Sequence, residues 1–413
     1  MATVLLRPSP AAPQVAVGVG PRLLAGIEEG PGLAAHRRRW AAPPATEAAA
    51  LVRLAELIGL RGRGGAGFPF ARKLATASRR GAVVVVNVSE GEPASFKDAA
   101  LALTRPHLIL DGAELIAGAL GSDEVHLVLP EEHTAVRDAV ATAIAERAAS
   151  GLSWRVHVAT PRFVAGQARA VLELMAGRPN LPVTAWQPEA FRGHRGRPTL
   201  LSNAETFSQL AAARALGADG FAELGTGEEP GTTLLTFNGD SGRPIVREVA
   251  LGTPWGRVVN DEALAAPVLV GGYHGAWLAA GALRGAVISR ADVQRVGASL
   301  GAGVVLPLAP GSCPLRRTAE IVGYLAAESA GRCGPCVNGL PALAAALAAL
   351  AQGAAGPQRV EELVALVTGR GACAHPDGTA RLAASVLRTF PGELAAHRRG
   401  RCDAREPGWE MSA

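Results

Sequence analysis

The feature that most constrains the fold is a regular alternation of strand-like and helix-like segments between residues 47 and 159. Three apolar runs have the length of strands, at 83–87, 125–129 and 155–159. The segments between them, 108–120 and 131–149, carry apolar residues at helical spacing. Strands joined by helices of this length form parallel βαβ units with right-handed crossovers. The pattern predicts an open α/β sheet, in which ligands bind beyond the carboxyl ends of the strands.

A glycine-rich loop precedes the first of these strands. Residues 59–73 read GLRGRGGAGFPFARK. Glycines at this density let the backbone approach a bulky ligand and turn its N–H groups toward a phosphate, while the basic side chains add charge. The loop also spells GxGxxG, but that dinucleotide fingerprint requires a preceding strand, and here a helix at 47–60 precedes it. We therefore expect a phosphate-binding loop of another kind, with a plain glycine-rich linker as the alternative.

Polar residues follow the strand 83–87. The sequence NVSEGEPASFKD places Glu90 and Glu92 at the carboxyl end of this strand, with Lys97 and Asp98 just behind them. Two carboxylates there could bind hydroxyl groups of a cofactor or orient a cationic substrate; an acidic surface turn is the alternative. Among 41 lysines and arginines only Lys73 and Lys97 are lysines, which favours sites that need a compact ammonium group.

The remaining chain divides into an N-terminal stretch and two later regions. Residues 1–46 show little periodicity, so we expect an extended or partly ordered segment. Apolar runs at 233–237 and 245–249 predict a hairpin. Four segments with apolar spacing near 3.6 predict a C-terminal four-helix bundle, at 318–329, 341–352, 359–368 and 378–389. The predicted domains are 1–46, 47–225, 226–300 and 310–400, with a tail at 401–413.

Three of the five cysteines lie in the connections between these helices. Cys333 and Cys336 form a C-x-x-C pair, and Cys373 precedes the last predicted helix. Thiolates spaced in this way can converge on one metal centre. The possibilities are a four-iron cluster with an outside ligand, a three-iron cluster, a zinc site that includes His375, or no metal. The candidates for the outside ligand are His375, Cys313 and Cys402.

Composition excludes several classes of protein. The chain is 48% hydrophobic and 19% charged, which is typical of a globular protein with two or three domains. Its net charge of +5 is modest and the arginines are scattered, so we expect no nucleic-acid partner. No apolar run approaches the roughly 20 residues that cross a bilayer, and no signal-peptide layout is present. We expect a cytoplasmic protein without direct membrane insertion.

Taken together, these motifs resemble a known family. GLRGRGGAGFP followed by a strand and N-x-x-EGEP-x-x-FKD is similar to the flavin-binding, NADH-oxidising 51 kDa-type subunit of respiratory complex I and to the related diaphorase subunits of hydrogenases and formate dehydrogenases. Three later stretches follow in the order of that family: FVAGQARAVLELMAGRP at 163–179, RPTLLSNAET at 197–206 and ESAGRCGPC at 328–336. Several long motifs in one order are more specific than any single pattern.

The resemblance implies a fold and a function. It implies an α/β domain with an open, parallel, Rossmann-like sheet that binds FMN, then a small β-grasp (SLBB-like) module, then a four-helix bundle with an iron–sulfur loop. The implied activity is that of an FMN-dependent NADH:acceptor oxidoreductase. Electrons would pass from NADH through FMN to the cluster and then to a ferredoxin-like iron–sulfur partner.

The resemblance also assigns roles to individual residues. Phe68 would lie on the NADH side, and Glu92 would be the catalytic residue near the nicotinamide and ribose. The cluster ligands would be Cys333, Cys336 and Cys373. The other cofactor-binding residues would be Gly62, Arg63, Gly64, Gly65, Gly67, Lys73, Asn87, Glu90, Gly166, Asn203 and Thr206.

The chain departs from the family pattern at several positions. Gln167 and Ala168 replace two glutamates that would face the flavin and NADH, and Ala330 replaces the first cluster cysteine. Smaller changes are Ser89 for Asp, Phe163 for Tyr and Ser202 for Asn. Two alternatives therefore stay open. One is a flavoprotein electron-transfer component with a donor other than NADH, and the other is a redox-inactive scaffold with a zinc or empty cysteine site.

Overall fold

The structure is a computed structural model that describes residues 3–5, 14–79, 81–147, 151–238, 243–402 and 404. The chain divides into two compact units. The first comprises residues 1–253 and 301–304, and the second comprises residues 254–300 and 305–413. Among the described residues no helix is long and apolar enough to cross a membrane.

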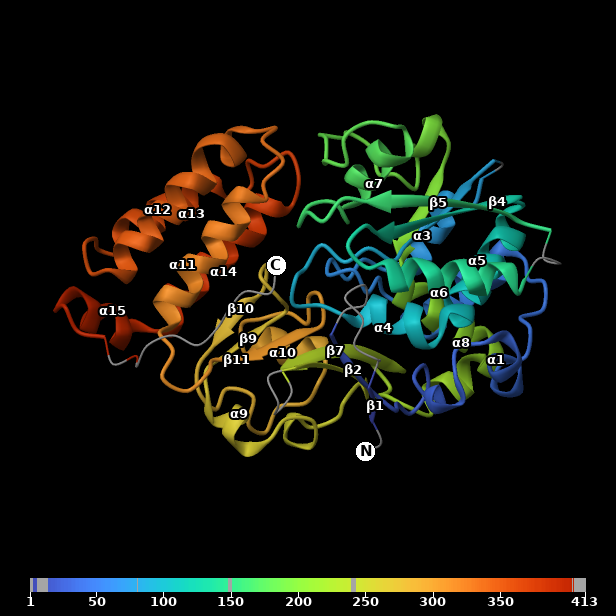
Figure 1. Ribbon diagram of the computed structural model, residues 1–413, viewed down its shortest axis with the longest axis horizontal. Coiled ribbons are helices and arrows are strands. Elements are labelled where there is room, and N and C mark those ends of the chain that lie inside the picture. The colour runs from blue at the N-terminus through green and yellow to red at the C-terminus, as the bar shows by residue number, and fades with distance from the viewer. Residues whose placement is uncertain are drawn as a thin grey trace. The chain divides into compact units, whose positions relative to one another are not determined.

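The first unit contains a four-stranded parallel sheet (Figure 1). Its strands, in spatial order, are β5 (Ser153–Ala159), β4 (Glu124–Pro130), β3 (Val83–Asn87) and β6 (Thr199–Asn203). The three predicted strands are confirmed, whereas β6 was not recognised as a strand. The chain runs outward from β3 through β4 to β5 and returns on the other side of β3 at β6. The strand order therefore reverses between β3 and β6, where open α/β sheets bind ligands.

Side chains alternate between the two faces of this sheet. Val84 and Val86 pack into the larger hydrophobic core, together with residues of helices on that face. Val83 and Val85 pack on the opposite face against α7 (Ala168–Met175). The helices that contribute to the larger core are α2 (Ala48–Leu57), α3 (Phe70–Ala77), α4 (Lys97–Thr104), α5 (Pro106–Leu120), α6 (Thr134–Ala145) and α8 (Ala204–Ala222). Burial on both faces explains the continuous valine run of β3.

The three helices predicted in this unit are present within a few residues of the expected bounds, whereas α3, α4, α7 and α8 were not predicted. The predicted helices 47–60 and 108–120 correspond to α2 and α5. The predicted helix 131–149 begins later and ends earlier, as α6, and residues 148–150 lie outside the described part of the chain.

A second group of strands in the first unit includes the predicted hairpin. β7 (Thr232–Asn238) and β8 (Pro244–Ala250) pair antiparallel, and residues 239–242 between them lie outside the described residues. β2 (Ala16–Gly18) pairs parallel with β8, and β1 (Thr3–Leu5) pairs with β2.

Part of the N-terminal stretch is more regular than expected, because it is anchored to this sheet. It also forms α1 (Leu33–Arg39), and Leu23 and Leu24 are fully buried. The buried carboxylate of Glu248 accepts three backbone N–H bonds, from Arg22, Leu23 and Leu24, at 2.8–3.0 Å.

The second unit begins with short elements. β9 (Val268–Val270) pairs antiparallel with both β10 (Ala276–Leu278) and β11 (Val304–Pro307). Two short helices, α9 (Asp261–Ala265) and α10 (Arg290–Arg295), accompany these strands.

Longer helices form the rest of the second unit. The four helical segments predicted near the C-terminus are present as α11 (Pro314–Ala327), α12 (Leu340–Ala351), α13 (Gln358–Val367) and α14 (His375–Thr389). α11 packs against α12 and α14, and α13 packs against the same two helices. A further helix, α15 (Pro391–Arg398), was not predicted.

Candidate functional site

The glycine-rich loop links α2 to α3 and is closed at its base. Gly62 N–H donates to the Phe68 carbonyl at 2.9 Å, and Phe70 N–H donates to the Leu60 carbonyl at 2.9 Å. The tip of the loop, at residues 64–66, is exposed. Its backbone turns through the left-handed region at Gly65 (φ 99°) and Gly67 (φ 60°), which favours glycine. A helix precedes the loop, as the sequence indicated, so it is not an ordinary dinucleotide-binding turn.

The loop lies against the end of β6, beside the reversal of strand order. Arg63 N–H donates to the Thr206 hydroxyl at 2.9 Å. A Cβ built on Gly64 would lie 3.9 Å from the Asn203 side chain. Asn203 ends β6 and pairs in register with Asn87, which ends β3. The predicted positions of the loop and of both strand ends therefore meet at the carboxyl edge of the sheet.

The acidic segment after β3 packs against residues 163–167. Asn87 Nδ2 donates to the Gly166 carbonyl at 3.0 Å. A Cβ on Gly91 would lie 2.2 Å from the Phe163 carbonyl oxygen, so only glycine fits at position 91. Two stretches that are far apart in sequence thus form one wall of the site.

Glu90 is a partly buried acid in this wall. Its carboxylate accepts a hydrogen bond from the Ser95 hydroxyl at 2.6 Å and one from Ala99 N–H at 3.0 Å. Burial and the nearby Asp98 charge raise the pKa of Glu90 to about 7, although Lys97, Ser95 and Ala99 act in the opposite direction. This carboxyl can therefore hold or release a proton near neutral pH.

A buried ionic network lies behind Glu90. Lys97 Nζ is 2.6 Å from Asp98 Oδ2 and 3.5 Å from Glu205 Oε2. The amide Nδ2 of Asn203 donates to both carboxylate oxygens of Asp98, at 3.1 Å each. Asp98 also accepts a hydrogen bond of 2.9 Å from Glu205 N–H. All three charged side chains are nearly inaccessible to solvent. Because each charge is paired, the network ties the starts of α4 and α8 to Asn203 at the end of β6 rather than contacting solvent.

The pKa values of this network follow from burial and charge. Burial lowers the pKa of Lys97, but the charges of Asp98, Glu205 and Glu90 outweigh it, and the net pKa is raised. Burial raises the pKa of Glu205. Glu205 was not among the predicted site residues; its one signal in the sequence is a carboxylate shortly after the apolar run 199–201.

Other predicted residues turn toward protein rather than toward open space. The Arg63 guanidinium donates to the Thr232 carbonyl at 3.1 Å, and its Nε lies 3.9 Å from Glu205. Thr206 is fully buried. Lys73 Nζ pairs with Glu189 at 2.8 Å and donates to the Leu201 carbonyl at 3.0 Å. The structure thus places these side chains behind the loop and beside β6.

Two predicted residues lie nearer to solvent. Phe68 is 50% exposed at the end of the loop, which is unusual for a large aromatic side chain. Glu92 is partly buried and accepts a weak bond from Ala94 N–H at 3.4 Å. Both lie in the segments that form the loop and the acidic wall.

Two of the three predicted cluster cysteines are in contact in the second unit, and the third lies nearby. Among the described residues the three sulfur atoms do not all lie within 4.8 Å of one another. Cys333 and Cys336 follow α11, with their sulfur atoms 3.1 Å apart. Cys373 precedes α14 and lies close enough that its charge contributes to the raised pKa of Cys336, after burial and Cys333. Burial raises the pKa of Cys333, but N–H donors of Ala372 and Cys336 outweigh it, so the net pKa is lowered. Thiols gathered in this way suit iron or zinc.

None of the three residues proposed as outside ligands points at this centre with a ring nitrogen or sulfur that lacks another partner. Both ring nitrogens of His375 are engaged, Nε2 with the Leu325 carbonyl at 2.8 Å and Nδ1 with His274 at 3.1 Å. Cys313 precedes the 14-residue helix α11 and Cys333 follows it, so about 21 Å of helix lies between them. Cys402 lies beside Cys313. Cys313 and Cys402 thus lie at the far end of α11 from Cys333, whereas His375 stays beside Cys373 with its ring held by Leu325 and His274.

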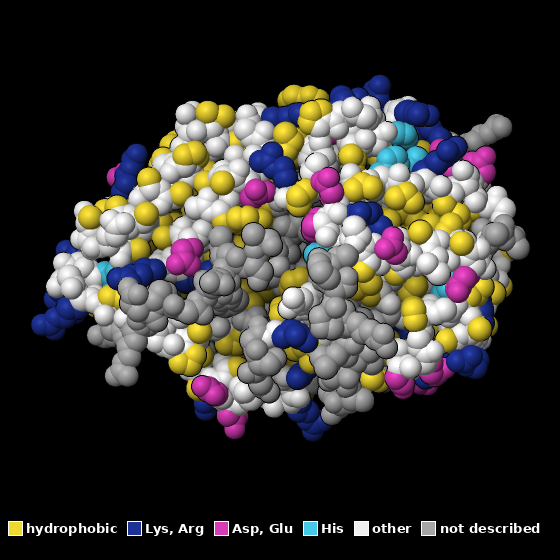
Figure 2. Space-filling view, in the orientation of Figure 1, with side chains coloured by type: hydrophobic (Ala, Val, Ile, Leu, Met, Phe, Trp, Pro, Cys, Tyr) yellow, Lys and Arg dark blue, Asp and Glu magenta, His cyan; other side chains and the backbone are white. Residues whose placement is uncertain are grey.

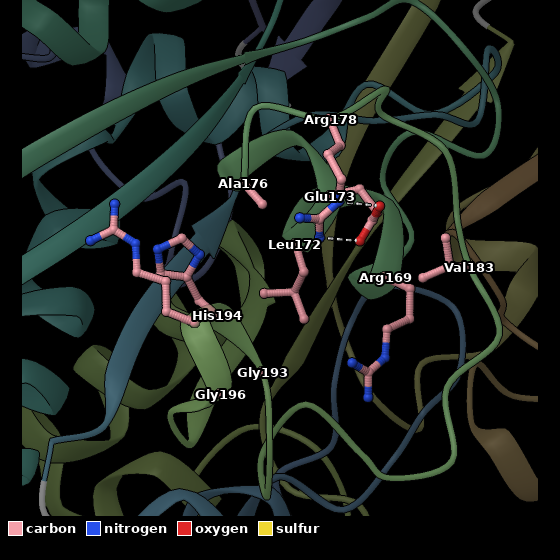
Figure 3. Close-up of a pocket in the computed structure, with 10 residues that line it drawn as sticks. Arg169, Leu172, Glu173, Ala176, Arg178, Val183, Gly193, His194 and Gly196 are labelled. Atoms are coloured by element: carbon pink, nitrogen blue, oxygen red, sulfur yellow. Dashed lines mark hydrogen bonds and ion pairs between the residues drawn. The ribbon is translucent and has the colours of Figure 1, made fainter.

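A separate cavity lies beside α7 (Figure 3). Arg169, Leu172, Glu173 and Arg178 line one side of it, and Gly193, His194 and Gly196 line the other. Arg178 is bound to Glu173 by two contacts of 2.7 and 2.6 Å. None of the lining residues is a predicted site residue, so this cavity is distinct from the glycine-loop site.

Comparison with known proteins identifies the family. A family model described as the Nuo51 FMN-binding domain matches residues 56–212. A second, described as the NADH-ubiquinone oxidoreductase-F iron–sulfur binding region, matches residues 316–397. The chain belongs to the 51 kDa-type family of NADH-oxidising subunits. The two matches cover the glycine-loop site and the cysteine centre, in that order.

Relatives of this 51 kDa-type chain include subunits of NADH-quinone oxidoreductases. The NADH-quinone oxidoreductase F 2 subunit of Rhizobium meliloti (strain 1021) is 26% identical over 372 residues, covering 84% of this chain and 88% of the relative. The NADH-quinone oxidoreductase F subunit of Escherichia coli (strain K12) is 27% identical over 366 residues, covering 82% of each. A solved NAD⁺-reducing [NiFe]-hydrogenase in the H₂-reduced state superposes with a TM-score of 0.80 at 26% identity, over 92% of this chain and 67% of that one.

Membership of the 51 kDa-type family specifies the cofactors. The chain is an FMN-binding, NADH-oxidising subunit that carries an iron–sulfur cluster and transfers electrons onward. The two alternatives, a different electron donor and a redox-inactive scaffold, are not favoured by these matches. The residues of the loop fit FMN, because Gly62 and Gly64 have no positive φ and a Cβ on either would meet no protein atom closer than 3.7 Å. Their lack of a side chain suits a ligand that approaches the backbone.

Proposed function

We propose that this chain binds FMN against the tip of the glycine loop and oxidises NADH there, and that it passes the electrons to a partner subunit through the cluster at Cys333, Cys336 and Cys373. The observation that carries the proposal is the pair Gly62 and Gly64. Neither backbone conformation nor protein packing requires glycine at these positions, whereas Gly91 is required by the Phe163 carbonyl. A ligand surface against the loop accounts for them.

Bound FMN would supply the redox chemistry, because a flavin accepts two electrons from a nicotinamide and releases them singly to an iron–sulfur cluster. The chain positions it. The loop backbone at 64–67 would present N–H groups to the phosphate, since the N–H groups of Gly62 and Arg63 already bond to the protein. Asn87 and Asn203 close the strand ends, and Gly166 lets the acidic segment pack closely beside them. Lys73 adds a positive charge beside β6, shared with Glu189.

The chain also controls protons and stacking at the site. Glu90, with its pKa raised to about 7, would hold or release a proton beside the bound cofactor near neutral pH. Half-exposed Phe68 offers an aromatic face to NADH. Glu92 lies two residues beyond Glu90 and would contact the nicotinamide or ribose. Gln167 would contact NADH through its neutral amide, at a position where the family has a carboxylate. This removes one negative charge that would repel the phosphates of NADH, so NADH stays the proposed donor.

The cluster would have three protein ligands. Ala330 provides no thiolate, so the centre would be a three-iron cluster or a four-iron cluster with a ligand from outside the chain. The cluster would lie in a four-helix bundle over 310–400. A separate SLBB-like β-grasp module would occupy 226–300. A ferredoxin-like iron–sulfur subunit would be the acceptor, because relatives of this chain are parts of NADH-quinone oxidoreductases and a hydrogenase. A cytoplasmic location would give access to NADH.

FMN binding to apoprotein tests the site directly. Gly64→Ala adds a methyl group whose nearest protein atoms lie 3.9 Å away, so the fold should be unaffected. If the flavin lies against the loop, overpacking should cost about 1–3 kcal/mol, which weakens FMN binding by roughly five- to 150-fold. Titration with FMN, followed by quenching of its fluorescence, measures the change.

The matched control is Gly118→Ala on α5, where an added Cβ meets nothing within 4 Å. This variant should bind FMN as the unmodified protein does. Equal affinity in Gly64→Ala and Gly118→Ala would show that the flavin does not lie against the loop.

A further inference from the structure

A second group of metal-ligating side chains lies in the second unit, apart from the cluster cysteines. Cys313 Sγ, one ring nitrogen of His397 and Cys402 Sγ all lie within 4.8 Å of one another. Cys313 and His397 are buried and Cys402 is partly buried. They come from the start of α11, from α15 and from the segment just after α15. The fold, not a local turn, brings these three side chains together.

The ring of His397 is oriented for a ligand on the side of the thiols. Nδ1 lies 2.7 Å from the carbonyl oxygen of Ala351, at the end of α12. A carbonyl can only accept, so Nδ1 carries the proton and Nε2 presents its lone pair. Nε2 lies 3.3 Å from Cys313 Sγ. Histidines that bind metals almost always donate their other N–H to a carbonyl or carboxylate in this way.

The spacing fits a small tetrahedral ion. Zinc bonds of about 2.3 Å to sulfur and about 2.1 Å to nitrogen separate the two ligand atoms by about 3.6 Å at the tetrahedral angle. The observed 3.3 Å needs an adjustment of only a few tenths of an ångström. Two thiolates and one imidazole form a soft donor set that favours zinc over calcium or magnesium.

We propose that Cys313, His397 and Cys402 bind a structural zinc ion that is separate from the iron–sulfur centre. Glu393 lies one helical turn before His397, with its carboxylate 4.0 Å from Nε2 and outside the group of three ligand atoms, so its side chain would have to turn toward the ion to supply a fourth ligand. The ion ties the start of α11 to the end of α15, and through the Ala351 carbonyl it also holds the end of α12. α11 leads into the loop of Cys333, and α12 follows Cys336, so the zinc ion braces the helices that carry the cluster from their far ends.

Metal analysis of the full-length chain tests the proposal. Protein purified without oxygen, from medium supplied with iron and zinc, should contain one zinc per chain in addition to its iron. X-ray absorption at the zinc edge should show two sulfur ligands and one nitrogen ligand. Zinc absent from this protein, or zinc with three or more sulfur ligands, would overturn the assignment, and neither result depends on how a variant folds.

Variants then locate the ion. Cys402→Ser should lower zinc content by about tenfold or more and leave iron unchanged, since the side chain lies beyond α15. The matched control is Cys333→Ser, which should lower iron and leave zinc in place. Zinc that follows Cys333 rather than Cys402 would contradict the proposal. A Cys313–Cys402 disulfide in peptides mapped without reductant would contradict it as well.

Discussion

Glu90 makes a quantitative prediction about stability and pH. The pKa of its carboxyl is raised from 4.5 to about 7 in the folded chain, by burial and then by the charge of Asp98. The folded state therefore binds a proton more tightly than the unfolded state does. Stability from this group is fully present below pH 4.5 and is lost as the pH rises through 7. At about 1.4 kcal/mol per pKa unit, the loss amounts to about 3 kcal/mol.

The perturbation is Glu90→Gln, which keeps the shape and removes the titrating proton. The Gln side-chain oxygen can still accept the hydrogen bond from the Ser95 hydroxyl. The N–H of Ala99 then faces the NH₂ group of Gln, which is a donor, so this hydrogen bond is lost. That lost bond costs about 1 kcal/mol at every pH. The free energy of unfolding of the variant, relative to that of the unmodified protein, should therefore rise by about 3 kcal/mol between pH 4 and pH 8.

Urea unfolding of flavin-free protein, followed by tryptophan fluorescence at the two pH values, measures this shift. Comparing two proteins at each pH cancels the contributions of all other titrating groups. Glu56→Gln, which removes an exposed carboxylate on α2, serves as the control and should show no comparable shift. If the free energy of unfolding changed between pH 4 and pH 8 by the same amount in Glu90→Gln as in the unmodified protein, burial would not raise the pKa of Glu90 as assigned.

Three further predictions concern packing, charge and iron. Gly91→Ala should displace the acidic segment, because its Cβ would lie 2.2 Å from the Phe163 carbonyl oxygen; purified protein should lose most of its FMN, and full FMN content would contradict the close contact. Lys97→Met should destabilise the chain by about 3–5 kcal/mol in urea unfolding, since it leaves the buried Asp98 without its cation, whereas a loss below about 1 kcal/mol would show that the network is solvated. Ala330→Cys should raise iron content toward four per chain and give a four-iron signal in electron paramagnetic resonance; unchanged iron would show that position 330 does not face the cluster.

Much of the fold follows from local pattern. The strand 83–87 is found at the predicted residues, because four valines buried on both faces leave little choice of conformation. The strand pair β7 and β8 and the four predicted C-terminal helices follow from the spacing of apolar residues alone. β6 escaped prediction because its five residues read as part of the RPTLLSNAET motif, and only pairing with β3 makes them a strand.

The site was predictable in its parts and not in its assembly. The glycine loop, Asn87 and Asn203 were identified from motifs, and the structure brings them to one edge of the sheet. Arg63 and Thr206 were identified from motifs too, but their bond to each other and the approach of Arg63 to buried Glu205 follow from the fold alone. The partners of Cys313 lie 84 or more residues away in sequence, so the packing of α15 had to be known before they could be found.

The fine distribution of charge also depends on the fold. On the face shown in Figure 2, basic side chains are dispersed among acidic and apolar ones rather than gathered in a stripe. Of the two lysines, Lys97 is enclosed by carboxylates and Lys73 is paired with Glu189. A guanidinium is bulkier than an ammonium and would crowd the enclosed position of Lys97, which gives a physical reason for lysine there.

Reduction by NADH without oxygen tests the central claim most directly. Protein loaded with FMN should be yellow, and stepwise addition of NADH should bleach the flavin absorbance with an end point near one NADH per flavin plus the electrons taken by the cluster. Loaded protein whose flavin spectrum stays unchanged by excess NADH, while dithionite still bleaches it, would contradict the account.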